Sequence, residues 1–332
     1  MRSGTIQSMD SERGDLGRVS ILNVGTKILL KDVMDQYLRT LGDFKTYYAP
    51  NMSSALRVFQ ENTIQVILTE VDLGDGSAYR LIKELGGDNG LNDLYVILAL
   101  EDRSDALIAL ATEIEAHAII VKPFSAQDLK AQIDRFTAWR VMPKEPWLTL
   151  IEEARLAARD RRYRDAEVNF VEAMKLAPTN PVPFYKAGMY YIEKGDASMA
   201  ETFLKKSVEL KANYVPAVAA LGRVYLAKHD LVKAEEFLRK AHEISPLNPD
   251  RLVEMVRMYI ERSVEACKNS LRVDPSATAP HLLLGKLRAL LKDYTGSVQE
   301  LEKALPTLRD SARLEAQTYI ALSRKLGGIA KS

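Results

Sequence analysis

Three acidic side chains alternate along one short stretch of the sequence, VILTEVDLGDGSAYRLIKEL at residues 66–85. Glu70 ends an apolar run, and Asp72 and Asp75 follow it in a loop with two glycines. Lys122 comes directly after a second apolar run and precedes a proline. Carboxylates and an ammonium group at the ends of buried runs are groups that could hold a hard cation or contact a phosphoryl group. Their chemistry depends on the elements that position them.

Five short apolar or β-rich runs, each followed by a helical pattern, fill the first part of the chain. They are VSILNV (19–24), FKTYYA (44–49), IQVILTE (64–70), LYVILAL (94–100) and HAIIV (117–121). Continuous apolar runs between helices predict a parallel sheet covered on both faces, and five such units predict a flavodoxin-like, doubly wound α/β domain. Ligands of such sheets bind beyond the carboxyl ends of the strands. Those predicted ends are Val24, Glu70, Leu100 and Val121.

The loop after the third run resembles a known family. VILTEVDLGDGSAYRLI looks like the centre of a bacterial response-regulator receiver domain, where a strand and its aspartate precede an x-x-L-P-D-G-S-G loop and a helix. VKPFSAQDL resembles the closing Lys-Pro and last helix of that domain. The resemblance covers roughly residues 19–138 and includes the order of the elements. It implies a CheY-like fold for residues 18–138.

The resemblance also implies a pocket, from which this sequence departs at most positions. Receivers phosphorylate an aspartate using a magnesium ion, which that aspartate and an acidic pair hold, while a hydroxyl and a lysine contact the phosphoryl group. The corresponding residues here are Glu70 (acceptor), Gly25 and Thr26 (acidic pair), Asp72 (backbone carbonyl), Leu100 (hydroxyl), Ile119 (aromatic switch) and Lys122 (lysine). Lys122 alone keeps the family's side chain. We therefore expect a degenerate receiver, or pseudo-receiver, without metal or cofactor.

The loss of these ligands bears on phosphorylation. Magnesium requires nearly octahedral oxygen ligands, and without it the charge on a transferred phosphoryl group is not neutralised. We therefore expect that Glu70 is not phosphorylated. Its carboxylate could reach Lys122 and imitate the phosphorylated product, or it could merely balance Lys122 in an inert pocket, and the sequence leaves both interpretations open. Receivers usually carry a cis bond before the retained proline, so we expect Lys122–Pro123 to be cis.

The second part of the chain is repetitive. Segments 147–180, 181–214 and 215–248 align without gaps at the 34-residue period of the tetratricopeptide (TPR) repeat, a pair of helices. The resemblance to that family covers residues 147–328 and predicts an α-solenoid. Small residues recur where paired helices must approach closely, at Ala154, Gly188 and Gly222, at Ala166, Ala200 and Ala234, and at Ala173, Ser207 and Ala241.

The later repeats depart from this pattern. The fourth segment, 249–277, is five residues shorter and lacks the usual turn between its helices. Either its helices run on as one or the turn is distorted, and the sequence does not distinguish the two. The fifth segment, 278–311, restores the pattern, and 312–328 resembles a capping helix that ends at glycines. Cys267 falls on a core position of the shortened segment, where packing is its expected role.

The first helices of the repeats are expected to line a concave groove. Such grooves bind extended or helical peptides. The geometry of the family places these residues on the groove: Arg155, Tyr185, Met189, Arg223, Arg257 and Lys286. Four of the six are basic and occupy the same position in four repeats. The implied ligand is an acidic segment with an apolar anchor, unless these charges are simply solvated.

Composition excludes several classes of function. The chain has 46 basic and 45 acidic side chains among 332 residues, so its net charge of +1 does not indicate nucleic acid or a membrane surface as a partner. One cysteine, scattered histidines and no long apolar run fit a reducing, cytoplasmic setting without a disulfide, a metal site or a membrane span. Residues 1–17 are predicted to form a disordered tail, and 139–146, which contain two prolines, a linker.

Together these patterns predict a protein without enzymatic activity. We expect a signalling adaptor or scaffold of a bacterial two-component or phosphorelay pathway, whose degenerate receiver docks one partner, for example through its last helices, and whose TPR groove recruits another. The alternative is a phosphorylation-operated response regulator with a TPR output domain. A transcription factor is disfavoured because no basic helix-turn-helix follows the receiver. A homodimer is compatible with the sequence, which identifies neither partner nor pathway.

Overall fold

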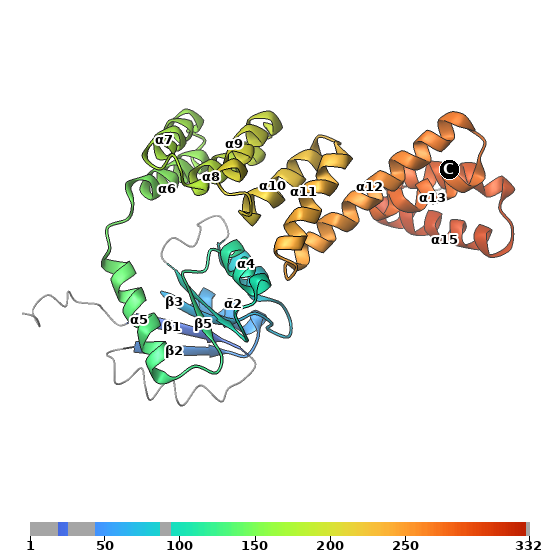
Figure 1. The fold of residues 1–332 in the computed structure, drawn as a ribbon. Coiled ribbons are helices and arrows are strands. Elements are labelled where there is room, and N and C mark those ends of the chain that lie inside the picture. The colour runs from blue at the N-terminus through green and yellow to red at the C-terminus, as the bar shows by residue number, and fades with distance from the viewer. Residues whose placement is uncertain (1–18, 26–43, 87–93, 330–332) are drawn as a thin grey trace, which may run out of the picture. The chain divides into compact units, whose positions relative to one another are not determined.

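The computed structural model describes residues 19–25, 44–86 and 94–329. The chain divides into two compact units with the main boundary after Glu152, and Figure 1 shows both with labels on many of their elements. The first unit is α/β and the second is helical. The predicted tail, residues 1–17, lies outside the described residues.

One parallel sheet forms the centre of the α/β unit. Its five strands are β1 (Val19–Val24), β2 (Phe44–Ala49), β3 (Val66–Glu70), β4 (Tyr95–Leu100) and β5 (Ala118–Val121). Their spatial order is β2-β1-β3-β4-β5, and every neighbouring pair is parallel. The predicted doubly wound sheet is confirmed, and β1 and β2 have the predicted bounds.

Both faces of this sheet are buried, because successive residues of a strand enter different cores. Ile21 and Leu22 lie in opposite cores, as do Leu68 and Ile67, and each is at most 3% exposed. This alternation is the period of two that a strand imposes on its side chains. Among the described residues, the covering helices are α2 (Met52–Glu61), α3 (Ala78–Gly86) and α4 (Asp105–Glu113) on one face, and α5 (Ala126–Val141) on the other.

Helices account for nearly all of the remaining chain. They are α6 (Pro146–Arg159), α7 (Tyr163–Leu176), α8 (Pro181–Glu193), α9 (Ala197–Leu210), α10 (Val215–Ala227), α11 (Leu231–Ile244), α12 (Pro249–Val273), α13 (Thr278–Leu290), α14 (Tyr294–Ala304), the 3-10 turn η2 (Leu305–Thr307) and α15 (Asp310–Gly327). Because α5 extends to Val141 and α6 begins at Pro146, helix occupies both ends of the predicted linker, 139–146.

The same close approach recurs inside three helix pairs. A glycine of the first helix lies against a leucine of the second, with the same spacing along the chain in each pair. A Cβ added at the glycine would lie closer to the leucine Cγ than non-bonded carbons approach, at 2.6 Å for Gly188 and Leu204, 2.7 Å for Gly222 and Leu238, and 2.5 Å for Gly285 and Leu301. The repeat inferred from the sequence therefore corresponds to a contact between paired helices that recurs in the structure.

The turn within each of these three pairs, and within the pair of α6 and α7, also repeats. One residue of the turn adopts a left-handed conformation, with φ of 60° at Arg161, 81° at Gly195, 58° at His229 and 63° at Lys292. After the last three of these turns an aspartate caps the second helix, as Asp196 does by accepting hydrogen bonds from the backbone N–H groups of Ser198 and Met199. These features reverse the chain within a few residues, so that the second helix packs antiparallel to the first.

The fourth segment contains no such reversal. Pro249 to Val273 form one helix of 25 residues, α12, drawn as one unbroken ribbon in Figure 1. Of the two outcomes that the sequence left open, the helices run on. Cys267 is 6% exposed within α12, which confirms its packing role, and burial raises the pKa of its thiol.

A ladder of glutamates links neighbouring repeats. Glu167, Glu201 and Glu235, one repeat apart, each pair with a cation from the following repeat: Lys194, Lys228 and Arg262. The hydroxyl of Tyr225 also donates to Glu201 at 2.8 Å, and that of Tyr259 donates to Glu235 at 3.3 Å. Because Tyr259 and Arg262 continue this ladder, the first half of α12 keeps the register of a first helix.

The ladder makes stability depend on pH. Hydrogen bonds from Lys205 and Lys228 lower the pKa of Glu201 to about 2 from 4.5. Since the folded-state pKa is the lower one, this stabilisation is complete above about pH 4.5 and is lost as pH falls toward 2. We expect Glu201→Gln to lower the free energy of unfolding by about 1 kcal/mol at neutral pH and to reduce its decline below pH 4.5.

Urea unfolding followed by circular dichroism across this pH range measures the effect. Glu209→Gln is the matched control, since it removes an exposed ion pair with Lys206 in the same helix, and it should change little. Parallel stability curves for wild type and Glu201→Gln would contradict the proposed contribution.

Candidate functional site

The candidate pocket lies at the carboxyl ends of the strands. Glu70 is the last residue of β3, Gly25 follows β1, and Lys122 follows β5. Backbone hydrogen bonds to neighbouring strands hold Gly25 and Lys122 in place. The Gly25 N–H donates to the Ala49 carbonyl at 3.0 Å, and the Lys122 N–H donates to the Leu100 carbonyl at 2.8 Å. The Lys122–Pro123 bond is cis, as expected. The sheet therefore brings together residues that are distant in the sequence.

The predicted contact between Glu70 and Lys122 is confirmed. The Lys122 Nζ lies 2.5 Å from the Glu70 Oε1 and 2.9 Å from the Glu101 Oε1. The side chains of Lys122 and Glu70 are 17% and 15% exposed, whereas that of Glu101 is 76% exposed. Lys122 thus ties the ends of β3 and β5 to the residue that follows β4.

These two carboxylates control the charge of the lysine. Burial on its own would lower the pKa of Lys122, but the hydrogen bonds to Glu70 and then Glu101 outweigh it, and the pKa is raised. The ammonium group therefore stays protonated at neutral pH. Two of its three N–H donors point at carboxylate oxygens.

Gly25 provides the space that the Glu70 side chain occupies. A Cβ added at Gly25 would lie 2.7 Å from both the Cδ and the Oε2 of Glu70, closer than non-bonded atoms approach. The glutamate at the acceptor position and the glycine at the first position of the acidic pair therefore fit together, because the longer Glu70 side chain extends over a residue that has no side chain. Thr26, at the second position of the acidic pair, lies outside the described residues.

The other acids of the loop serve the local fold. Asp72 Oδ1 accepts a hydrogen bond from the Gly74 N–H at 2.9 Å. Asp75 accepts from the backbone N–H groups of Met52 and Ser53 at 2.7 and 3.0 Å, at the start of α2. The side chain and backbone of Ser53 hold the pKa of Asp75 below its usual value. Both carboxylates are thus committed outside the pocket.

The residues present do not fit a magnesium site. One oxygen of Glu70 binds Lys122 and the other lies over Gly25. Within the described parts of the chain, no three acidic, histidine or cysteine groups gather closely enough to hold a metal ion. Octahedral coordination by protein oxygens would need more ligands than the described residues at this edge of the sheet offer. Leu100, at the hydroxyl position, is fully buried, and Ile119 packs on the same core.

In the helical unit, carboxylates accompany the predicted groove cations. Arg223 pairs with Glu254 at 3.2 Å, Arg257 with Glu261 at 3.3 Å and Lys286 with Glu315 at 2.7 Å. The surface therefore has mixed charge, which differs from the row of positive charge that the cations alone predict. The sequence could have indicated one pair, because Arg257 and Glu261 are four residues apart on a helix, but Glu254 and Glu315 come from other helices.

The predicted apolar residues of the groove lie beside these charges. The Arg223 Nη2 lies 3.9 Å from the Met189 sulfur, so side chains of successive repeats meet. The Tyr185 ring packs edge-on against Tyr214, with 5.6 Å between the ring centres. The structure thus brings Met189 and Arg223 together and places Tyr185 in an aromatic pair.

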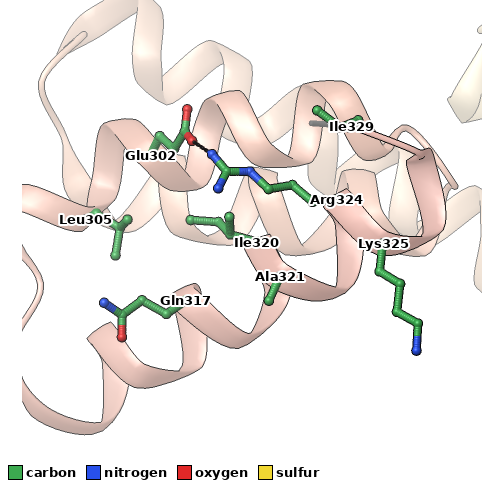
Figure 2. Close-up of a pocket in the computed structure, with 8 residues that line it drawn as sticks. All are labelled: Glu302, Leu305, Gln317, Ile320, Ala321, Arg324, Lys325 and Ile329. Atoms are coloured by element: carbon green, nitrogen blue, oxygen red, sulfur yellow. Dashed lines mark hydrogen bonds and ion pairs between the residues drawn. The ribbon is translucent and has the colours of Figure 1, made fainter. Parts of the chain in front are cut away.

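A pocket that the sequence did not indicate lies between α14 and α15 (Figure 2). Its volume is about 590 Å³, and the Arg324 Nη2 bonds to the Glu302 Oε1 beside it at 2.6 Å. The lining residues are Glu302, Leu305, Gln317, Ile320, Ala321, Arg324, Lys325 and Ile329. No motif distinguishes these residues, because they come from different helices and are of common types.

No described helix has both the length and the apolar character that crossing a bilayer requires. Known proteins are similar to each unit separately. Residues 21–134 match the response regulator receiver domain, and residues 183–214 match a tetratricopeptide repeat. Chemotaxis protein CheY-3 of Vibrio cholerae serotype O1 is 27% identical over 123 residues, which are 35% of this chain and 95% of that protein.

Two solved structures are also similar to parts of the chain. One is the chemotaxis response regulator CheY4 of Vibrio cholerae, with 17% identity, coverage of 36% of this chain and 99% of that chain, and a TM-score of 0.34. The other is the TPR domain of Arabidopsis OM64, with 19% identity, coverage of 34% and 94%, and a TM-score of 0.32. The family matches show that this chain carries a receiver domain, typical of two-component signalling, together with a TPR module of the kind that mediates protein contacts.

Proposed function

We propose that this chain is a non-enzymatic signalling adaptor of a two-component pathway. Its pseudo-receiver, residues 18–138, docks one protein, and its TPR region, residues 147–328, recruits another protein or peptide. The observation that carries this proposal is the contact of 2.5 Å between Glu70 and Lys122 over Gly25. The ammonium group that would contact a phosphoryl group in a working receiver is engaged by a permanent carboxylate here.

The contact gives Glu70 a means to act on the surface of the domain. Lys122 also binds Glu101, which follows β4 and precedes α4. A carboxylate fixed on Lys122 therefore holds the ends of three strands together without a phosphoryl group or a metal. In this proposal Glu70 keeps the receiver in one docking state, and α4 and α5 are the elements whose position it influences.

For the TPR groove we propose a ligand that is recognised by apolar and charged groups together. Met189 and Tyr185 supply apolar contacts, and the ion pairs of Arg223, Arg257 and Lys286 reduce the net positive field. An acidic ligand has to displace those paired carboxylates, so we expect a weaker dependence on salt than four free cations would produce.

The docking role of the receiver is tested by affinity capture with the full-length chain. We expect Glu70→Gln to lose the receiver partner, because a neutral amide interacts much less strongly with the Lys122 ammonium than a carboxylate does. Glu84→Gln, the same substitution at an exposed residue of α3, is the matched control and should capture the partner as wild type does. Equal capture by wild type and Glu70→Gln would leave the Glu70 contact as an inert ion pair.

The groove is tested separately. Arg223→Glu together with Arg257→Glu places like charges beside Glu254 and Glu261, and should reduce capture of the groove partner at least about tenfold while the receiver partner is retained. Arg239→Glu in α11 is the control, since its pair with Glu243 is exposed. If the double variant binds as wild type does, the TPR ligand lies elsewhere.

A further inference from the structure

The first half of α12 carries an apolar stripe on its surface. Leu252 is 49% exposed, Val253 68%, Val256 57% and Tyr259 43%. These side chains lie within two turns of one helix, whereas isolated exposed apolar residues are ordinary on protein surfaces. Met258, between them, is fully buried, so this part of α12 is docked on one side and exposed on another.

The repeat register explains why this face is exposed. Val256 occupies the position of Gly222, and Tyr259 occupies that of Tyr225, one repeat later. In the preceding repeat the second helix covers both positions: Gly222 lies against Leu238, and the Tyr225 ring stacks on Phe237 with 5.4 Å between the ring centres. In α12 the second half continues straight on, so it cannot fold back over the first half.

The second half of α12 has the complementary character. It packs on α13, and Cys267, which occupies the position of Leu238, is buried there. Ala266 occupies the position of Phe237 and is exposed. The sizes at one contact are therefore reversed relative to the other pairs: Val256 stands where the first helix has glycine, and Cys267 where the second has leucine. Opposite Tyr259, the small Ala266 replaces Phe237.

We propose that a second copy of this chain covers the stripe, with the two α12 helices antiparallel across a two-fold axis between Glu261 and Arg262. The second half of each helix then completes the helix pair that the other copy lacks, in an exchange of identical elements. This pairing places Val256 opposite Cys267 of the second copy and Leu252 opposite Leu271. At the axis, Ile260 of each copy faces Ser263 of the other, because both lie one turn along the same face of the helix, from Val256 and from Cys267.

The chain itself supplies the reasons for choosing this occupant. The segment is short by the residues that form the turn in other repeats, and loss of a turn favours exchange between copies because the hairpin cannot close within one chain. The helix that belongs on the stripe is present in α12, in the register of a second helix. The residues that this register brings together at the axis, Ile260 and Ser263, are uncharged, so a symmetric pair places no like charges face to face there.

Sedimentation equilibrium of the full-length chain tests the pairing. We expect a dimer, and we expect Val253→Glu with Val256→Glu to raise its dissociation constant at least about tenfold, because buried carboxylates would lack partners. Both side chains are exposed in a single copy, so the fold should persist by circular dichroism. Val168→Glu, equally exposed on α7, should leave the dimer intact. A monomeric wild type, or a dimer unaffected by the double variant, would overturn the proposal.

Cross-linking tests the register. Val256 and Cys267 of one chain lie three turns apart on one helix and cannot form a disulfide with each other. Val256→Cys should therefore give a covalent dimer on mild oxidation through Cys267 of the second copy, and adding Cys267→Ser should abolish most of it. A dimer that forms no cross-link, or one in which the cross-link does not depend on Cys267, would overturn the antiparallel arrangement.

Discussion

Replacing Lys122 with methionine should lower the free energy of unfolding of the α/β unit by about 1–3 kcal/mol, between the values typical of exposed and buried ion pairs. The substitution keeps much of the apolar stem but leaves the Glu70 carboxylate, 15% exposed, without its ammonium partner. An uncompensated charge at this depth is more costly than a neutral pair. Lys130→Met, which breaks an exposed pair with Asp134, should cost well under about 1 kcal/mol.

Urea unfolding followed by fluorescence of Trp139 measures this loss. Trp139, a residue of α5, packs on Tyr95 at the margin of the core, and Trp147→Phe in all variants removes the other indole signal. Adding Glu70→Gln to Lys122→Met should recover part of the stability, with a coupling free energy of about 0.5–3 kcal/mol. Additive effects of the two substitutions would show that the contact contributes nothing to holding the pocket together.

The second large effect is expected in the helical unit. Gly222→Val should lower the free energy of unfolding by about 1–3 kcal/mol, because the added Cβ meets the fully buried Leu238 at 2.7 Å and its backbone nitrogen at 3.2 Å. The leucine cannot move away without opening the contact between α10 and α11. Ala227→Val, at the exposed end of α10, is the control and should cost less than about 1 kcal/mol.

Urea unfolding followed by circular dichroism at 222 nm, the usual helix band, gives both values. The comparison also bears on α12, where Val256 already occupies the position of Gly222. If Gly222→Val were tolerated as well as the control, the glycine would not be required for close packing of the helix pair. Val256 would then no longer indicate that the helix pair of the fourth segment differs from the others.

The sheet and the order of its elements could be predicted because apolar runs with turn residues between them are a local signal. β1 and β2 begin and end where the pattern predicts, and the contact between Glu70 and Lys122 follows once strand ends are known to meet. The interlocking of Gly25 with Glu70 could not be predicted, because it depends on the path of a side chain between two strands that are distant in sequence.

In the helical unit, too, the sequence predicts some features and does not predict others. The recurring small residues predicted close helix pairs, and the buried contacts confirm it at Gly188 and Gly222. The sequence could not decide whether segment 249–277 forms one long helix or two helices with a distorted turn. A missing turn shortens the segment in the same way in both cases. The carboxylates beside Arg223 and Lys286 were missed, since they belong to other helices and no local pattern joins them.

The replacement of a phosphorylated aspartate by Glu70 is tested most directly by intact mass spectrometry after incubation with acetyl phosphate and magnesium. A receiver that has the aspartate and the acidic pair, treated in the same way, is the positive control and should gain the mass of one phosphoryl group. We expect the mass of this chain to stay unchanged, because Glu70 is engaged by Lys122 and the residues around it do not fit a magnesium ion. A stoichiometric, magnesium-dependent gain of one phosphoryl group would contradict the proposal and make the chain a phosphorylation-operated regulator.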